Sequence, residues 1–420
     1  MPRMAASTMR DRGLLLRLQS QALQYFLDNQ TSGGLVLDRQ RNQGPLRTRG
    51  LCSLAATGMG CIALALASKG PYQLLRPQEA VLRIRAALQC ALHVLPHQNG
   101  ILPHFVDSHT GQVYGVDHFS TIETAWMTAG ALWAAAFLRD SGLELLARQL
   151  AERIDWYYWT APEESEIPLL RHGQAQDGRF LRSSWDRLNG ETVFMYVLAS
   201  GSAEDRAVPV AAWSHLRSFS GTTAGLHFNN SDLGLFVFQY GLDLLDLSVW
   251  LVPTGVDLAA ESGIATEANY RVCRALADTF TTYREYWGLS AGDGPAEPPA
   301  ELAYRCYAPG GPIDGTAHIT ATLASIARRP DLVWENIDRA AHERRWQLLG
   351  RYGFSNVNAD RDWVGADMVG IDAGAAVLAL DNYLNDNRVR NVFHTLPYVQ
   401  RGLERSGFRA APLAPPVRAA

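Results

Sequence analysis

The sequence has little cysteine, and none of it in a pattern that builds structure. Five cysteines occur among 420 residues, and no two of them form a CxxC pair. The eleven histidines lie singly, without an HExxH motif or a cysteine and histidine cluster at zinc spacing. The odd, scattered cysteines argue against a disulfide framework, and the missing clusters argue against a structural metal.

Neither sign of charge is in excess. Lysine and arginine number 38 against 42 aspartates and glutamates, which gives a net charge of −4 and a pI near 6.3. Nucleic acid is therefore not the expected partner, because phosphate binding favours a basic surface. Hydrophobic residues make up 47% and charged residues 19%, a balance typical of a compact soluble enzyme.

Long hydrophobic runs are also scarce. The uncharged run 51–68 reads LCSLAATGMGCIALALAS, close to the ~20 residues of a membrane-spanning helix. It is rich in alanine, glycine, serine and threonine, so we interpret it as a buried core helix and expect no membrane partner. The N-terminal residues show no apolar stretch followed by a cleavage site. If the chain is complete, we expect a cytoplasmic location, and otherwise a periplasmic one.

Helical patterns alternate with glycine, proline and aspartate loops along the whole chain. Apolar spacing predicts helices at 12–29, 51–69, 77–95, 121–141, 143–159, 190–199, 208–218, 238–251, 264–286, 317–327, 330–349, 372–385 and 388–406. Strand signals are weak and confined to 34–38 and 101–106. The pattern predicts a mostly helical chain.

A dozen or so helices without a repeat favour one all-α domain. The economical closed arrangement is an (α/α)6 barrel, a toroid of about twelve helices with long loops at the rim. Four predicted helices lack a charged stripe and are expected inside the toroid: 51–69, 121–141, 190–199 and 372–385. We expect the domain to span 11–408, with 1–10 and 409–420 as flexible tails.

Three carboxylates open helices that are otherwise almost uncharged. Glu123 lies in FSTIETAWMTAGAL, Glu191 in LNGETVFMY and Asp372 in VGIDAGAAV. A carboxylate in the first turn is often only a charge that the helix dipole favours. The inner helices of a toroid run parallel, however, so these three acids are expected around a shared cavity at one mouth.

Carboxylates that face one another in an aromatic-lined cleft are what glycosidic hydrolysis requires. One acid stays protonated and gives its proton to the leaving oxygen, while another is ionised and activates water. Burial and mutual repulsion separate the two pKa values. Aromatic residues near the rim loops can stack on sugar rings or equally well pack in the core: Trp185, Trp287, Tyr283, Tyr304 and Tyr352.

Other chemistries lack their motifs. No GxSxG elbow follows a strand, and no phosphate-binding GxxxxGK[ST] loop is present. Four histidines in loops or near helix starts can either bond a substrate or serve as ordinary structural imidazoles: His104, His118, His227 and His318. Hydrolysis by a carboxylate pair needs no metal or organic cofactor, and we expect none.

Eleven motifs in order between residues 50 and 408 carry a family resemblance. They are AATGMGCIALALA, NGILPHFVDSHTG, FSTIETAWMTAGAL, LNGETVFMYVLASGS, LFVFQYGLDLLDL, SGIATEANYRVC, WGLSAGDGP, APGGPIDGT, GRYGFSNVNAD, VGIDAGAAVLALDNYL and FHTLPYVQRGL. The chain resembles the glycoamylase-like family, which includes bacterial endo-β-1,2-glucanases and a domain of cyclic β-1,2-glucan synthases. The resemblance implies the same (α/α)6 barrel.

The resemblance also implies roles for individual residues. Glu191 matches the family's general acid, and Asp372 matches its general base or the equivalent. Glu123 stands where the family usually has aspartate, and it would position substrate or tune the pair. Further residues match polar positions of the family's substrate cleft: Gln239, Asp293 and Asp314. The implied mode of cleavage is inversion, with water activated directly or through a short relay.

Some positions depart from the family pattern. Val237 and Phe238 replace a common Thr-His pair, Leu384 replaces an arginine, and 296–300 forms an insert rich in alanine, glutamate and proline. Each change removes a hydrogen-bonding side chain expected near sugar hydroxyls. Activity on a glycan is therefore predicted more firmly than the identity of that glycan.

We predict a glycoside hydrolase that cleaves a β-glucan, with β-1,2-glucan or its oligosaccharides as the best single substrate. A retaining transglycosylase of the same fold is one alternative. The other is a carbohydrate-binding protein that has lost turnover, an interpretation favoured by Val237, Phe238 and Leu384. The sequence leaves the linkage, the chain length and endo or exo action open.

Overall fold

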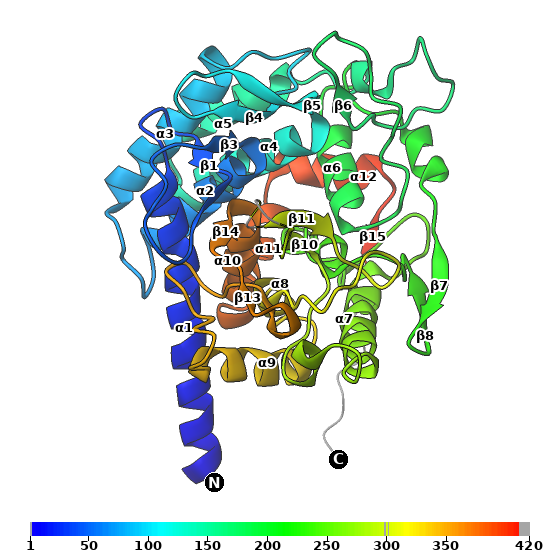
Figure 1. Cartoon of the computed structure of the whole chain (residues 1–420). Helices are drawn as coiled ribbons and strands as arrows, with labels where there is room; N and C mark the ends of the chain where they lie inside the picture. Colours follow the sequence, from blue (N-terminus) through cyan, green and yellow to red (C-terminus); the bar gives the residue numbers. More distant parts are fainter. Residues whose placement is uncertain (1, 298–299, 301, 411–420) are drawn as a thin grey trace.

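The computed structural model describes residues 2–297, 300 and 302–410, and these residues form a mostly helical molecule with many short strands (Figure 1). The α-helices are α1 (Pro2–Asn29), α2 (Leu54–Ala67), α3 (Pro77–His93), α4 (Thr121–Leu138), α5 (Ser141–Arg153), α6 (Gly190–Ser200), α7 (Leu258–Ala275), α8 (Ile319–Leu323), α9 (Pro330–His342), α10 (Gly370–Leu384), α11 (Arg388–His394) and α12 (Pro397–Arg405). The prediction of a mostly helical chain is confirmed.

The strands are β1 (Val36–Leu37), β2 (Arg39–Arg41), β3 (Leu51–Ser53), β4 (Pro103–Asp107), β5 (Val113–Ser120), β6 (Gly173–Gln174), β7 (Ser220–Thr223), β8 (Leu226–Asn229), β9 (Trp250–Leu251), β10 (Ala291–Gly294), β11 (Ala303–Cys306), β12 (Val357–Asn358), β13 (Trp363–Val364), β14 (Asp367–Val369) and β15 (Arg409–Ala410). The largest sheet is antiparallel in the order β1-β3-β4-β5-β6. Sequence signals predicted only β1 and β4, because most of these strands are too short to show a period of two.

Three short strands lead directly into buried helices. β3 continues into α2, β5 into α4, and β14 into α10. β3 and β5 belong to the same five-stranded sheet, and β14 pairs with β2. The strands thereby fix where these helices begin and which of their first-turn side chains lie close together.

The helices predicted to lie inside are the most deeply buried ones. Every residue of α2 is buried, and so are most residues of α4, α6 and α10. α2 packs against α4, α10 and α1, while α4 packs against α5 and α6. Figure 1 shows α2, α4, α6 and α10 around the centre of the view, with α1, α3, α7 and α9 outside them. Among the described residues, no helix combines the length and hydropathy needed to cross a bilayer.

Two predicted helices are wrong, and a third is divided. The segment 208–218 contains the 3₁₀ turn η2 (Val210–His215), and the segment 238–251 contains the end of η3 (Leu235–Phe238) and the strand β9. Gly241 ends any helical course there, because it adopts a positive φ of 76° and lies against the backbone of Gly190. Pro397 opens α12 and separates it from α11 within the predicted helix 388–406.

Parts of both predicted tails lie within the described residues. Residues 2–10 form the first turns of α1, and residues 409–410 pair as β15 with β9. Residues 411–420 of the predicted C-terminal tail lie outside the described residues.

Two glycines let α2 and α4 approach backbone to backbone. A Cβ on Gly58 would lie 2.2 Å from the carbonyl oxygen of Trp126, and one on Gly130 would lie 1.9 Å from that of Gly58. Gly58→Ala should therefore destabilise the protein by roughly 1–3 kcal/mol or more, as overpacking does. Gly13→Ala is the matched control, since the space around Gly13 in α1 is open and alanine is the better helix former. Chemical denaturation measures both, and equal stabilities would contradict the close approach.

Candidate active site

Three carboxylates lie in the first turns of α4, α6 and α10. Glu123 follows β5 by three residues, Glu191 follows the capping residue Asn189, and Asp372 follows β14. Asn189 accepts a hydrogen bond from the amide of Thr192, which fixes the start of α6. Glu191 and Asp372 are partly exposed, whereas Glu123 is buried.

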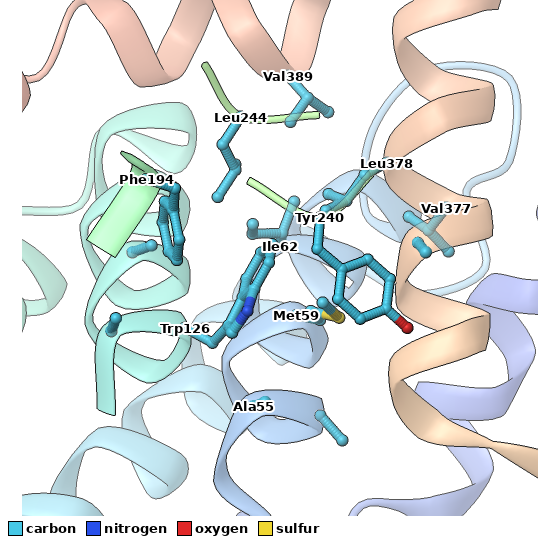
Figure 2. Packing of buried hydrophobic residues seen from close by; sticks show 14 of the residues in the cluster. Ala55, Met59, Ile62, Trp126, Phe194, Tyr240, Leu244, Val377, Leu378 and Val389 are labelled. Carbon is cyan, nitrogen blue, oxygen red and sulfur yellow. The ribbon is translucent and has the colours of Figure 1, made fainter. Parts of the chain in front are cut away.

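Glu191 changes ionisation near neutral pH. Burial raises its pKa to about 7, the charge of Glu123 adds to this, and a hydrogen bond with Trp126 acts against it. Trp126 comes from α4 and packs against Phe194 of α6, with ring centroids 4.7 Å apart (Figure 2). The indole of Trp126 on α4 therefore contacts the carboxyl group of Glu191 on α6.

Asp372 has a similar pKa but different neighbours. Burial raises its pKa to about 7, and the charges of Asp293 and Asp38 contribute. Arg39 and a hydrogen bond from Tyr240 lower the pKa, the Tyr240 hydroxyl donating to Oδ1 at 3.3 Å. A carboxyl group balanced in this way changes ionisation close to neutral pH.

Tyr240 interacts with both carboxyl groups. Its ring packs at 85° to that of Trp126, with centroids 6.1 Å apart (Figure 2). Burial and the charges of Asp372 and Glu191 all raise the pKa of its phenol. The sequence predicts no role for Tyr240, although this residue follows Gln239 directly in a family motif.

Removing the Tyr240 hydroxyl should raise the pKa of Asp372 above 7. Phenylalanine keeps the ring but cannot donate to the ionised carboxylate, which the hydrogen bond favours. Carbon-13 NMR titration of the aspartate carboxyl groups in Tyr240→Phe measures the shift. Tyr196→Phe is the control, because the Tyr196 hydroxyl bonds the backbone of Leu170 and Trp185 instead. An unchanged Asp372 titration would show that the hydroxyl does not stabilise the charge.

Glu123 connects α4 to the beginning of α2. Its Oε2 accepts hydrogen bonds from the amide of Ala55 at 2.5 Å and from the hydroxyl of Ser53 at 3.0 Å. These donors belong to the first turn and the capping residue of α2, where backbone amides have no partner within the helix. Glu123 thus satisfies one helix N-terminus while standing at another. Its pKa is nevertheless raised, chiefly by burial.

His104 carries a positive charge beside Glu123. Its Nε2 lies 3.4 Å from Oε1 of Glu123, and its Nδ1 lies 2.5 Å from Oδ2 of Asp117. Burial alone would lower the pKa of His104, but these two carboxylates raise it to about 9. Of the four histidines considered from the sequence, His104 is the one in contact with a candidate acid.

Arg39 of β2, whose charge lowers the pKa of Asp372, pairs with three aspartates. Its Nη1 lies 3.1 and 3.0 Å from the two carboxylate oxygens of Asp293, and it also pairs with Asp38 and Asp367. Asp293, a predicted substrate-binding residue, is buried, and burial raises its pKa against the effect of Arg39. The charge of Asp293 in turn raises the pKa of Asp372.

The predicted aromatic residues divide into two groups. Trp185 is partly exposed, and its indole donates to the hydroxyl of Thr121 at the start of α4. Trp287 and Tyr352 are buried and pack edge to face against Tyr270 and Tyr25. Their rings have no open face, so a sugar-stacking role for Trp287 or Tyr352 does not fit this structure.

Tyr304 is the exposed ring close to Asp372. Its side chain is 46% exposed. Burial raises the pKa of its phenol most, and the charge of Asp372 raises it further. Tyr304 lies on β11, directly opposite Asp293 of β10. One hairpin thus presents both an aromatic ring and a carboxylate toward Asp372.

Two polar residues that were predicted to bind substrate, Gln239 and Asp314, hold loops in place. The amide of Gln239 is buried and donates to the carbonyl of Ala321 and the hydroxyl of Ser325. Asp314 accepts hydrogen bonds from Tyr307 and from the amide and hydroxyl of Thr316. Both side chains have protein partners.

Three of the departures from the family pattern are buried, and residues 298–299 of the insert 296–300 lie outside the described residues. Val237 and Phe238 are buried in a small apolar cluster with Phe228 and residues of α7. Leu384 is the last residue of α10, roughly 18 Å along the helix from Asp372 at 1.5 Å per residue. The expectation that these changes remove groups near a sugar stays a prediction. Within the described residues, no group of three or more histidine, cysteine, aspartate or glutamate side chains could hold a metal ion.

A family model described as "Putative glucoamylase" matches residues 182–397. No curated protein matches the chain. The chain is 19% identical to a putative glucoamylase from Bacteroides caccae, with a TM-score of 0.82 over 96% of this chain and all of that one. It is 18% identical to an endo-β-1,2-glucanase from Chitinophaga pinensis in complex with sophorotriose and glucose, with a TM-score of 0.81 over 95% and 98% of the two chains.

A β-1,2-glucanase from Parabacteroides distasonis is 19% identical, with a TM-score of 0.81, and the match covers 94% of this chain and 60% of that one. At these identities the likeness concerns the fold. It extends over nearly the whole chain, well beyond the segment that the family model matches.

Proposed function

The chain belongs to the glycoamylase family, whose model spans half of it, and from this premise we propose that it is a glycoside hydrolase that cleaves a β-glucan. The observation that carries the proposal is the pair Glu191 and Asp372. Both are partly exposed, both have a pKa of about 7, and both face Tyr240 at the N-terminal ends of buried helices. Groups that change ionisation near neutral pH suit acid and base catalysis.

Glu191 is the proposed acid and Asp372 the proposed base. The proton of Glu191 passes to the glycosidic oxygen as its bond to the anomeric carbon breaks. Asp372 takes a proton from the water molecule whose oxygen attacks that carbon. Glu123, fixed by the start of α2 and by His104, raises the pKa of Glu191 through its charge and so keeps the acid protonated.

Inversion is the proposed stereochemical outcome. Inverting enzymes separate their carboxyl groups by roughly 6.5–9.5 Å, which leaves room for water, whereas retaining enzymes need about 5–5.5 Å. Trp126 and Glu123 act on Glu191, while Asp293, Asp38 and Arg39 act on Asp372. The charges of both carboxyl groups act on Tyr240, but their other main influences differ, and such separate surroundings support the wider spacing.

β-1,2-Glucan or its oligosaccharides are the proposed substrate. The support is the fold shared with the Chitinophaga pinensis endo-β-1,2-glucanase, which was crystallised with sophorotriose and glucose. Tyr304 offers an exposed ring and Trp185 a partly exposed one near the carboxylates, and Asp293 lies opposite Tyr304. We further propose an (α/α)6 barrel formed by one domain over residues 11–408.

Incubation with defined glucans tests the function. Linear and cyclic β-1,2-glucans should be shortened, β-1,3 and β-1,4 glucans should be left intact, and NMR of fresh products should show the inverted anomer. Products longer than the substrate with retained configuration would indicate the transglycosylase instead. Binding without any cleavage would indicate a non-catalytic protein.

A further inference from the structure

A pocket lies at the other end of α10 from Asp372. Its volume is about 460 Å³, within the range of small-molecule sites. Asn382 and Tyr383 line it from the last turn of α10, together with residues of the loop after η3 and the start of α7. Tyr383 stands roughly 16 Å along the helix from Asp372, at 1.5 Å per residue. The pocket is therefore separate from the proposed catalytic carboxylates.

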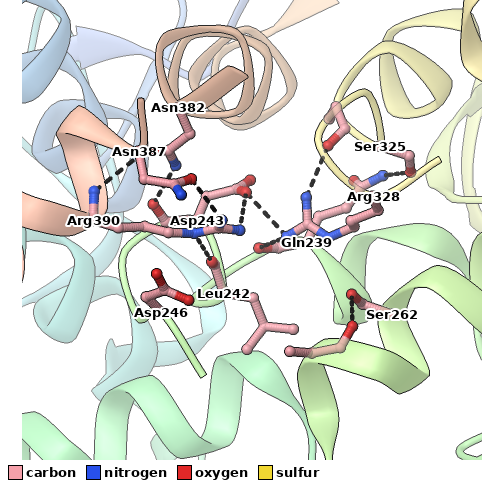
Figure 3. A network of polar contacts seen from close by, with 12 residues as sticks. Gln239, Leu242, Asp243, Asp246, Ser262, Ser325, Arg328, Asn382, Asn387 and Arg390 are labelled. Atoms are coloured by element: carbon pink, nitrogen blue, oxygen red, sulfur yellow. Dashed lines mark hydrogen bonds and ion pairs between the residues drawn. The ribbon is translucent and has the colours of Figure 1, made fainter. Parts of the chain in front are cut away.

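Two arginines line this pocket in fixed positions (Figure 3). Arg328 donates to Oδ1 of the buried Asp243 at 2.9 Å. Arg390 donates through Nε to the carbonyl of Leu242 at 2.9 Å and through Nη1 to Oδ1 of Asn387 at 3.0 Å. Because both guanidinium groups are held by the protein itself, a ligand would find them already oriented.

One side-chain nitrogen of these two arginines has no hydrogen-bond partner among the described residues. Nε of Arg328 is buried without a hydrogen bond to any described residue, and only 4% of its side chain is exposed. A buried donor left without an acceptor costs about 1–3 kcal/mol. A ligand rich in oxygen atoms would bring acceptors to the wall that Arg328 forms.

The rim of the pocket combines an aromatic ring with carboxylates. Tyr383 is 44% exposed although most of α10 is buried. Asp246 and Asp386 also line the pocket, and Asp243 lies directly behind Arg328. These three carboxylates outnumber the two guanidinium groups, so the pocket offers no net positive charge to an anion such as phosphate.

We propose that this pocket is a second saccharide-binding site. The face of Tyr383 would stack on a pyranose ring, while Arg328, Arg390 and Asp246 would bond its hydroxyl groups. The choice of ligand rests on the proposed function, because a second site would hold a distant part of the same glucan. The geometry of the pocket does not depend on that function.

Calorimetric titration of the full chain tests the proposal. The Glu191→Gln chain, in which turnover should be strongly reduced, is titrated with a linear β-1,2-glucooligosaccharide. We expect two binding sites in this chain and a loss of at least tenfold in affinity at one of them when Tyr383→Ala is added. Tyr157→Ala, which changes a tyrosine of matching exposure (45%) outside the pocket, should keep both sites.

The possible results separate the two proposals. One site that Tyr383→Ala leaves unchanged would overturn the second site, and so would inorganic phosphate binding in the pocket without any saccharide. Equal losses from Tyr383→Ala and Tyr157→Ala would also overturn it. Failure of the wild-type chain to cleave any glucan would overturn the proposed function alone, because the Tyr383→Ala comparison measures binding and not turnover.

Discussion

Replacing Glu191 by glutamine should lower kcat by on the order of 10²–10⁴-fold while the protein stays folded, which is the usual contribution of a general acid. The amide has nearly the shape of the carboxyl group and can still accept the hydrogen bond of Trp126. It has no proton to give to the glycosidic oxygen. Turnover of β-1,2-glucan measures the loss, and thermal unfolding shows whether the fold is intact.

The leaving group of the substrate identifies the missing proton. A dinitrophenyl glycoside releases a stable anion that needs no proton, so most of the loss in Glu191→Gln should vanish with that substrate. Glu261→Gln is the matched control, since Glu261 also lies in the first turn of a helix, α7, and bonds the amide of Asn229. A Glu191→Gln chain with the wild-type rate on glucan would show that another group is the acid.

The sequence could predict where the three acids lie because that position depends on local patterns. An uncharged run with a carboxylate in its first turn identifies both a buried helix and the end of the helix that carries the charge. Glu123, Glu191 and Asp372 stand in the first turns of α4, α6 and α10 for this reason. The roles of the three residues stay predictions.

The sequence could not predict which side chains face those acids. Trp287 and Tyr352 lie in loops, but their rings are buried against those of Tyr270 and Tyr25. Leu384 shares α10 with Asp372 and yet lies at its opposite end. The sequence motifs do not show where a side chain points, so neighbours in a motif need not be neighbours in the site.

The polar partners of the acids were missed for a related reason. Arg39 sits on a strand of three residues, and its contact with Asp293 joins positions 254 residues apart. Tyr240 follows a 3₁₀ turn within a segment that was predicted as a helix. Such contacts depend on the tertiary fold, and the local pattern carries no sign of them.

Replacing Asp372 by asparagine should reduce kcat as strongly as the change at Glu191, and on every leaving group. Water attacks the anomeric carbon whichever group departs, so loss of the base persists with a dinitrophenyl glycoside. Asp381→Asn is the control within the same helix, because the buried Asp381 pairs with Arg388. Its loss should lower the melting temperature, since breaking a buried ion pair costs about 3–5 kcal/mol, and leave kcat nearly unchanged.

The pH dependence of kcat/KM separates the two carboxyl groups in the wild-type chain. Asp372 must be ionised, so the rate should rise as the pH increases through its pKa of about 7. Glu191 must be protonated, so the rate should fall as the pH increases through its pKa of about 7. Two coincident pKa values give a narrow bell near neutral pH, with roughly a quarter of the molecules in the productive form at its maximum. Asp372→Asn should remove the rising limb and keep the falling one, and a rising limb that survives in this variant would assign the base to another residue.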